Sequence, residues 1–565
     1  MTKRFSRMET LIDTAAGRRE PDLTLKNAQV VNVFTQEVLR ADVAVAGGRI
    51  AGVGQYGGPN TVDCSGLYLC PGFIDAHCHI ESSMAVPTEF SRAVLPSGTT
   101  ALIADPHEIV NVCGAVGLTF MLEQAERAVC DLYFMLPSCV PATAFETSGA
   151  AFAARDMRPF LRHPRVLGLA EMMNFPGVIA REPGVMEKLR LFRGRIIDGH
   201  APGLTGDTLQ AYAAAGVSTD HEANAYAEAL EKARAGFAVL VREGSAAHNL
   251  KDILQGAVRD RLPMRRFLLC TDDKHLNDIR LDGHIVHNIR MAIALGIPPA
   301  QAIAMATLNT AEHYGLKDRG AIAAGRIADL VLLSDLDTMH VEAVYKGGIP
   351  ASELLQRPAA AEPVPHAILN SVLVKPVTPD DLRMPVSGET DVMEMIPGQL
   401  VTNHLRETVP SVNGYFQPSE LYTKLCVLER HGKNGNIAVA PLKGYGVRGG
   451  AVATSVAHDS HNVIAAGDND RDIVVAVNHI REIGGGYAVV QNGAVTGSLP
   501  LRVAGLMSSE PYAQVERGTA AILEEAKKLH IAKGIEPFIS LSFMALPVIP
   551  TLRLTDKGLI DLFAG

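Results

Sequence analysis

The chain carries the stretch Phe73-Ile74-Asp75-Ala76-His77-Cys78-His79, an apolar run that ends in two histidines one residue apart. A short apolar run of this kind predicts a buried strand. Side chains at i and i+2 of a strand point to the same side, so both imidazoles can reach one metal ion, whereas Cys78 points away from them toward the core. On its own His-x-His is a weak signal. Its place at the carboxyl end of a strand, where barrel enzymes hold their active sites, favours a metal site.

Seven further runs of the same kind follow. Together the eight cover residues 73–77, 101–105, 132–136, 166–171, 195–200, 216–221, 239–243 and 267–272, and a helix-like stretch follows each. This is the pace of repeated βα units and predicts an α/β fold. Eight units within about 260 residues predict a (β/α)₈ barrel of the TIM type. An open doubly wound sheet is the alternative, but polar clusters at the strand ends favour closure.

Several of these runs end in residues that can bind metal. Run four ends in Glu171, run five in His200, run six in His221 and run eight in Asp272. Together with His77 and His79 they form a predicted ligand set for two divalent ions, in which a carboxylate can bridge the two cations. The alternative is that they are solvated loop residues. One such coincidence is easy to dismiss, but six residues at the ends of five strands are not.

The barrel is flanked by other structure. Residues 22–68 contain short strand patterns separated by Gly-Gly turns, and a similar pattern returns after residue 320. We therefore expect a small β domain built from both flanks, residues 22–68 and 331–379, the latter including a Pro- and Ala-rich linker at 358–365. The catalytic barrel is placed at 69–330 and a C-terminal α+β domain at 380–565.

Composition narrows the class of protein. The 565 residues hold 52 Lys and Arg against 61 Asp and Glu, a net charge of -9, which argues against a general nucleic-acid binder. None of the eight cysteines forms a Cys-x-x-Cys pair, and scattered thiols are typical of a reducing cytoplasm. No apolar run is long enough to cross a bilayer, so we expect no membrane association.

The order and placement of these residues resemble the amidohydrolase superfamily. Glu171 stands where many members have a carboxylated lysine, and a bridging glutamate occurs in the adenine deaminase branch. Local strings are similar to bacterial adenine deaminases of the long type: PGFIDAHCHIESSM at 71–84, DPHEI at 105–109, GLAEMMN at 168–174, DGHAPG at 198–203, CTDD at 270–273 and SVAHDSHN at 455–462. The similarity runs from about residue 20 to the C-terminus.

This resemblance implies a role in purine salvage, the hydrolysis of adenine to hypoxanthine and ammonia, by attack on C6 of a hydroxide that bridges two metal ions. It implies Mn²⁺, although mixed nitrogen and oxygen ligands also suit Fe²⁺ or Zn²⁺. Asp272 is placed to move a proton from the hydroxide to the leaving amine. A second acid must protonate the ring, and Glu81, His107, Glu108 and Glu243 are the candidates. Members of this class are commonly homo-oligomers.

Four residues are candidates for binding the purine. Asp273 can bond a ring nitrogen or be a solvated loop residue, and Asn174 can do so too, although a helix N-cap is the preferred interpretation. His458 and Asp459 belong to the cluster His458-Asp459-Ser460-His461, which holds the ingredients of a hydrolytic triad or a second metal site. We favour a loop that packs over the barrel mouth and helps to close the pocket.

Two other functions compete with this prediction. A different amidohydrolase reaction, such as the opening of a cyclic amide, would use the same metals, but the bridging glutamate and the string at 81–84 argue against it. A non-catalytic barrel that serves as an assembly module is the second alternative. Such a protein is expected to have lost ligands, and this chain keeps all six.

Overall fold

The computed structural model describes residues 2–245, 247–359, 363–397, 399, 401–549 and 551–561. Part of the predicted linker, residues 360–362, lies outside this range. Among the described residues, no helix is both long enough and apolar enough to cross a membrane.

All eight predicted runs coincide with strands. They are β6 (Phe73–Cys78), β7 (Thr99–Ala104), β8 (Asp131–Leu136), β9 (Val166–Met172), β10 (Ile196–Gly199), β11 (Thr219–Asp220), β12 (Ala238–Arg242) and β13 (Phe267–Cys270). Neighbouring strands pair in parallel, as five strands in the order β10-β9-β8-β7-β6 and three in the order β11-β12-β13. Most of their residues are buried, as expected of parallel strands covered on both faces.

The predicted barrel closure is corrected by the pairing of the strands, because the two sheets do not join into one continuous ladder. At one seam the Asp272 N–H donates to the His77 carbonyl at 3.0 Å, and at the other the Ser218 N–H donates to the Ile197 carbonyl at 2.9 Å. Only isolated bonds form at these seams, because β11 has two residues and β13 ends before the positive φ of Asp272.

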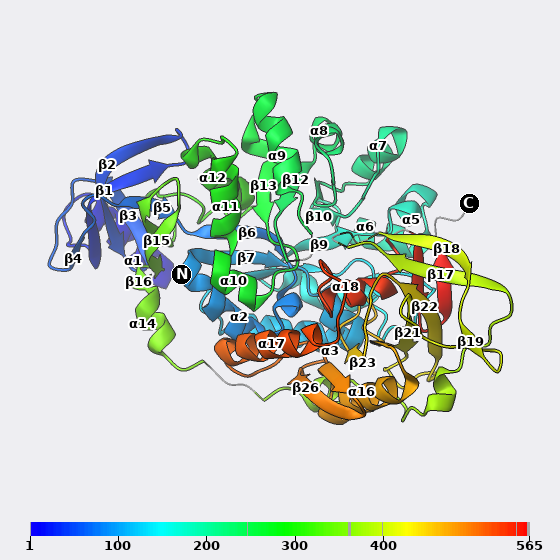
Figure 1. The fold of residues 1–565 in the computed structure, drawn as a ribbon. Coiled ribbons are helices and arrows are strands. Elements are labelled where there is room, and N and C mark those ends of the chain that lie inside the picture. Colours follow the sequence, from blue (N-terminus) through cyan, green and yellow to red (C-terminus); the bar gives the residue numbers. More distant parts are fainter. Residues whose placement is uncertain are drawn as a thin grey trace.

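Helices follow these strands and cover the outside (Figure 1). In α9 the buried residues Leu250, Ile253, Leu254 and Ala257 recur at the spacing that places one helical stripe against the sheet. The helices are α2 (Pro87–Val94), α3 (His107–Ala125), α4 (Ala154–Met157), α5 (Phe175–Ala180), α6 (Pro183–Leu191), α7 (Gly206–Ala214), α8 (Tyr226–Arg234), α9 (Leu250–Arg259), α10 (Leu276–Asp282), α11 (Ile285–Ala294), α12 (Pro299–Met305) and α13 (Leu308–His313).

An eight-stranded sheet lies to the left in Figure 1 and contains strands from both sides of the parallel-strand region in the sequence. Its order is β16-β15-β14-β5-β1-β2-β3, with β4 beside β1. The N-terminal strands are β1 (Leu23–Asn32), β2 (Glu37–Ala46), β3 (Arg49–Gly54), β4 (Thr61–Asp63) and β5 (Tyr68–Pro71), and the later ones are β14 (Leu330–Asp335), β15 (His340–Lys346) and β16 (Ile349–Pro350). Helices α1 (Thr2–Ala15) and α14 (Ala351–Gln356) flank this sheet.

The C-terminal region forms a third sheet with the order β18-β17-β22-β21-β24-β23-β25-β26. The strands are β17 (Glu389–Met395), β18 (Thr402–Thr408), β21 (Tyr422–Leu428), β22 (Ile437–Lys443), β23 (Gly450–Thr454), β24 (Val463–Gly467), β25 (Gly486–Gln491) and β26 (Ala494–Pro500). Small pairs are β19 (Ser411–Val412) with β20 (Tyr415–Phe416), and β27 (Leu552–Thr555) with β28 (Gly558–Asp561).

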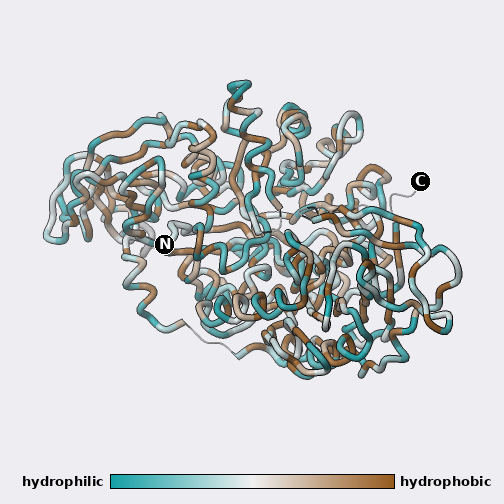
Figure 2. Tube along the Cα trace, in the orientation of Figure 1, coloured by the Kyte–Doolittle hydropathy of each residue, from teal (hydrophilic) through white to brown (hydrophobic). Residues whose placement is uncertain are grey.

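This C-terminal region packs directly on the α/β region that holds the parallel strands. Its helices are α15 (His366–Leu369), α16 (Asp470–Ile483), α17 (Tyr512–Lys527) and α18 (Ile539–Ser542). Teal and brown alternate along α17 in Figure 2, as expected of an amphipathic helix. The Ser508 N–H donates to the Met84 carbonyl at 2.8 Å, and the Tyr512 N–H donates to Glu89 at 2.9 Å. These bonds hold this segment of the C-terminal region beside the residues that follow β6 and His79.

Candidate metal centre and active site

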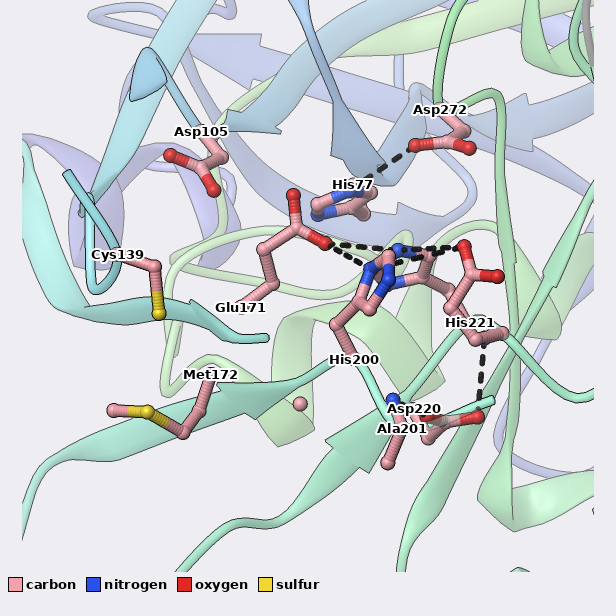
Figure 3. A network of polar contacts seen from close by, with 12 residues as sticks. His77, Asp105, Cys139, Glu171, Met172, His200, Ala201, Asp220, His221 and Asp272 are labelled. Carbon is pink, nitrogen blue, oxygen red and sulfur yellow. Dashed lines mark hydrogen bonds and ion pairs between the residues drawn. The ribbon is translucent and has the colours of Figure 1, made fainter. Parts of the chain in front are cut away.

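The two histidines of the opening stretch face one carboxylate. His77 lies within β6, and His79 follows it directly. Their Nε2 atoms lie 3.4 Å and 3.2 Å from Oδ1 of Asp272, which stands just beyond β13. Figure 3 shows His77 and Asp272 facing each other. The Nδ1 of His79 lies 3.1 Å from the Asp105 carbonyl. If this nitrogen carries the proton, Nε2 is left with a free lone pair toward the centre of the site.

Glu171, near the end of β9, stands between two groups of imidazoles. Its Oε1 lies 3.6 Å from Nε2 of His79, while its Oε2 lies 2.7 Å from Nδ1 of His200 and 3.1 Å from Nε2 of His221. Burial acts to raise the pKa of Glu171, but His200 and His221 outweigh it and hold the pKa well below its ordinary range. The carboxylate is therefore anionic and turns one oxygen to each group.

The donor atoms fit metal binding. Three groups whose donor atoms lie within 4.8 Å of one another include all six predicted ligands: His77, His79 and Asp272; His77, Glu171 and His221; His200, His221 and Glu222. Within the described residues, the buried Nε2 of His77 has no hydrogen-bond partner, which is costly unless another ligand satisfies it. Imidazole and carboxylate donors suit Mn²⁺, Fe²⁺ and Zn²⁺ alike. These residues support a metal site.

Asp272 is held from the side opposite to the histidines. Nη1 of Arg242, the last residue of β12, lies 3.0 Å from Oδ2 of Asp272, and the same guanidinium contacts both oxygens of Glu222. Burial acts to raise the pKa of Asp272, but His77 and His79 and the charge of Arg242 lower it well below its ordinary range. Glu222 and Arg242 are not among the site residues predicted from the sequence.

His107 is a further imidazole at this centre, at the start of α3. Its Nδ1 lies 3.1 Å from Oδ2 of Asp105 and 3.3 Å from Oε1 of Glu171. Its Nε2 lies 3.7 Å from Oδ1 of Asp459, a residue of the C-terminal region. Asp105, His79, His107 and Glu171 therefore form a fourth group with close donor atoms. His107 joins the barrel to the C-terminal region at the site.

Comparison with known proteins identifies the family. Residues 68–350 match the Amidohydrolase family, and residues 399–564 match the adenine deaminase C-terminal domain. Adenine deaminase of Desulfitobacterium hafniense is 47% identical over 98% of this chain and 97% of that protein. Adenine deaminase of Geobacillus kaustophilus is 46% identical over 98% of both. The chain belongs to the adenine deaminase family.

Among solved structures, a crystal structure of an adenine deaminase is similar to this chain. It superposes with a TM-score of 0.46 at 16% identity, and the match covers 59% of this chain and 99% of the other.

The adenine deaminase C-terminal domain supplies part of the cavity wall beside the candidate ligands. His458 Nδ1 lies 3.4 Å from Oε1 of Glu108, and the His458 ring stacks on Phe543 with centroids 4.8 Å apart. His458, Asp459, Phe543, Leu546 and Ile549 line the same cavity as Glu108 and His107. The sequence contained no signal for the apolar residues of this wall, because they follow no motif and lie more than 250 residues beyond the last barrel strand.

The remaining predicted residues divide into two groups. Asp273 lines the cavity and accepts a hydrogen bond from Ser82. Glu81, Glu243 and Asn174 are not among the residues that line it. Glu81 accepts from the Ile109 N–H at 3.3 Å, while Glu243 faces His248 at 2.7 Å. Asn174 accepts from the Gly177 N–H at 2.8 Å as the N-cap of α5, which was the preferred interpretation.

Proposed function

We propose that this chain hydrolyses adenine to hypoxanthine and ammonia at a centre of two divalent metal ions. The observation that carries the proposal is the division of the Glu171 oxygens, one toward His79 and the other toward His200 and His221, in a chain that belongs to the adenine deaminase family. A carboxylate in this position suits a bridge between two cations. A cyclic amide remains the alternative substrate, and the complete ligand set argues against a non-catalytic barrel.

His77, His79, Asp272 and Glu171 would hold one ion, and Glu171 with His200 and His221 would hold the other. When bound, the pair of cations lowers the pKa of a water molecule and so supplies the nucleophile for C6. We propose Mn²⁺ as the metal, with Fe²⁺ or Zn²⁺ as alternatives that the same donors accept.

Asp272 is proposed to move the proton that the leaving group needs. Its Oδ1 faces the two histidines, whereas its Oδ2 is occupied by Arg242. Oδ1 is therefore the atom that takes a proton as water adds to C6, and that returns it to the amino nitrogen as ammonia leaves. Water and adenine enter, hypoxanthine and ammonia leave, and the carboxylate is regenerated.

Glu108 is proposed as the acid that protonates the purine ring. Of the four candidates only Glu108 and His107 line the cavity, and His107 is engaged by Asp105, Glu171 and Asp459. Burial raises the pKa of Glu108 well above its ordinary range, and the nearby carboxyl of Glu81 adds to the effect. A carboxyl group that keeps its proton near neutral pH can donate it to a ring nitrogen, and Glu108 would recover a proton from the hydroxyl on C6 as the carbonyl of hypoxanthine forms.

We propose that Asp273, His458 and Asp459 contact the polar edge of the base. Asp273 is fixed by Ser82, and the two C-terminal residues line the same cavity. Phe543, Leu546 and Ile549 provide the apolar surface that a flat aromatic base requires. Asn174 is left out of this set because its side chain caps α5.

Wider features of the molecule follow the same proposal. We propose that the two parallel sheets act as one (β/α)₈ barrel at 69–330, between a small β domain formed by 22–68 and 331–379 and a C-terminal domain at 380–565. We propose a homo-oligomer because oligomers are common in this class of enzymes. We propose the cytoplasm as its location because the eight cysteines form no disulfide among the described residues.

Ammonia release from adenine tests the function directly. The protein is purified metal-free, reloaded with Mn²⁺ and assayed with adenine, adenosine and dihydroorotate. We expect turnover of adenine alone, with two equivalents of metal required. If fully loaded protein releases no ammonia from adenine but opens dihydroorotate, the deaminase proposal is wrong and the cyclic amide alternative replaces it.

A further inference from the structure

Arg242 forms a buried bridge between two carboxylates at the carboxyl ends of three neighbouring strands. Glu222 follows β11 by two residues, Arg242 ends β12, and Asp272 follows β13 by two residues. Nη1 of Arg242 bonds to Oε1 of Glu222 and lies 3.0 Å from Oδ2 of Asp272, while Nη2 lies 3.1 Å from Oε2 of Glu222. The guanidinium therefore binds Glu222 through two nitrogens, and one of them, Nη1, also donates to Asp272.

The side chain of Asp272 needs a second support because its backbone lies beyond the end of its strand. Its φ is +58°, in the left-handed region where few residues other than glycine lie. The backbone is held by β6, since the Asp272 N–H donates to the His77 carbonyl and its carbonyl accepts from the His79 N–H at 3.1 Å. On the side away from His77 and His79, the guanidinium of Arg242 is paired with its carboxylate.

Arg242 is itself fixed on several sides. Its backbone N–H donates to Oδ1 of Asn249 at 2.8 Å, and Nδ2 of Asn249 donates to the carbonyls of His221 and Ala223 at 3.0 Å and 2.9 Å. The Arg242 side chain is 6% exposed. A buried guanidinium fork with a bidentate partner and a tethered backbone has little freedom to rotate.

We infer that Arg242 is a positioning residue for the reaction: anchored by Glu222, it holds Oδ2 of Asp272 so that Oδ1 stays turned toward His77 and His79. The inference rests on the proposed role of Asp272 in proton transfer. Without this contact the carboxylate could tilt, and the oxygen that takes the proton would no longer lie beside His77 and His79. Because Oε1 of Glu222 also lies 3.5 Å from Nε2 of His221, the same pair links Asp272 to the second group of imidazoles.

A purely structural role is the competing explanation. In that case Arg242 only neutralises two buried acids, and its removal should unfold the protein or release metal rather than misplace one oxygen. Lysine separates the two explanations, because it keeps the positive charge but cannot present a planar fork to two carboxylates.

The test compares full-length, Mn²⁺-loaded wild type with Arg242→Lys, Arg242→Ala and Glu222→Gln. The control is Arg265→Ala, which removes an exposed arginine paired with Glu312. Since a misplacement of about 1 Å can cost roughly 10²-fold in rate, we expect Arg242→Lys to lower kcat about 100-fold with KM changed less than about threefold. Guanidinium added at low concentration is expected to raise the turnover rate of Arg242→Ala at least about tenfold. It would not restore the activity of a variant that has unfolded.

A second readout does not depend on turnover. In the Co²⁺-substituted proteins, the visible spectrum reports the geometry of the ligands, and it should differ from wild type in Arg242→Lys but not in Arg265→Ala. An unchanged kcat and spectrum in Arg242→Lys would overturn the inference, as would a loss without guanidinium rescue in a protein that has lost metal or fold. Failure of wild type to deaminate adenine would sink the proposed function instead, and the spectral comparison would still decide the position of Asp272.

Discussion

One buried carboxyl group, Glu146, should contribute less and less to the stability of the protein as the pH rises from 5 to 8. This residue lies after β8 in the loop whose next residue, Thr147, bonds to Asp556 of the C-terminal domain through its N–H at 2.8 Å. Burial raises the pKa of Glu146 to about 8, and the charge of Asp459 adds to this against an opposing contribution from the Ser460 hydroxyl.

The direction of the change in stability with pH follows from the direction in which folding shifts the pKa of Glu146. A group whose pKa is higher in the folded than in the unfolded protein stabilises the fold below its unfolded pKa and loses this contribution as the pH rises through the folded pKa. For Glu146 the two values are 4.5 and about 8. At about 1.4 kcal/mol for each pH unit, the contribution lost is about 5 kcal/mol above pH 8 and about 3 to 4 kcal/mol between pH 5 and pH 8.

Glu146→Gln isolates this contribution because glutamine stays neutral. Both proteins are unfolded in urea at pH 5, 6.5 and 8 and followed by circular dichroism. Between pH 5 and pH 8 the free energy of unfolding of the variant should rise by about 3 to 4 kcal/mol relative to that of wild type. Other titrating groups are common to both proteins and cancel in the difference. Glu420→Gln, at an 81% exposed side chain, is the control and should show no such gain. Parallel pH profiles for wild type and Glu146→Gln would refute the reasoning.

Three further outcomes are expected. Glu171→Gln should reduce bound metal below two equivalents and lower kcat/KM at least about 10³-fold, measured by elemental analysis and ammonia release, because one neutral amide cannot serve both cations; retention of both metals would contradict the bridge. Lys232→Met should destabilise the protein by about 3 to 5 kcal/mol in urea unfolding, since it leaves Asp220, 2.7 Å from the ammonium, buried without its partner. Asn174→Ala should cost about 1 kcal/mol of stability by loss of the cap to Gly177, with KM for adenine unchanged; a raised KM would return Asn174 to the binding site.

The metal centre could be anticipated because its residues lie at the ends of strands. A strand boundary fixes both the position and the direction of a side chain, so the periodicity that predicts β6 also aims His77 and His79 at one point. The same argument placed Glu171 and Asp272, whose strands run parallel to β6. Strand-end chemistry in a repeated βα pattern is local information, and local information is present in one sequence.

Continuous barrel closure could not be judged in the same way. Whether a sheet closes depends on the hydrogen bonds between strands far apart in the chain, and β11 is reduced to Thr219 and Asp220. The roles of Arg242 and Glu243 were hidden for a related reason. Alternation sends the two neighbours to opposite sides, and only the register of β12 shows that Arg242 faces Asp272 while Glu243 faces His248.

The C-terminal domain belongs to the chemistry as well as to the architecture. The barrel alone brings the metal-binding residues together, but it leaves Glu108 and His107 on one side of an open mouth. His458 and Asp459 approach these two residues at 3.4 Å and 3.7 Å from a separate sheet, and Phe543 stacks behind His458. A hydrolase that must protonate a ring nitrogen needs its acid in a dry, fixed position, because water competes for the proton and weakens each electrostatic contact. Under the proposed function, the C-terminal domain that covers these residues would keep Glu108 dry enough to act as the acid, so the predicted ligands and this cover would belong to one active site.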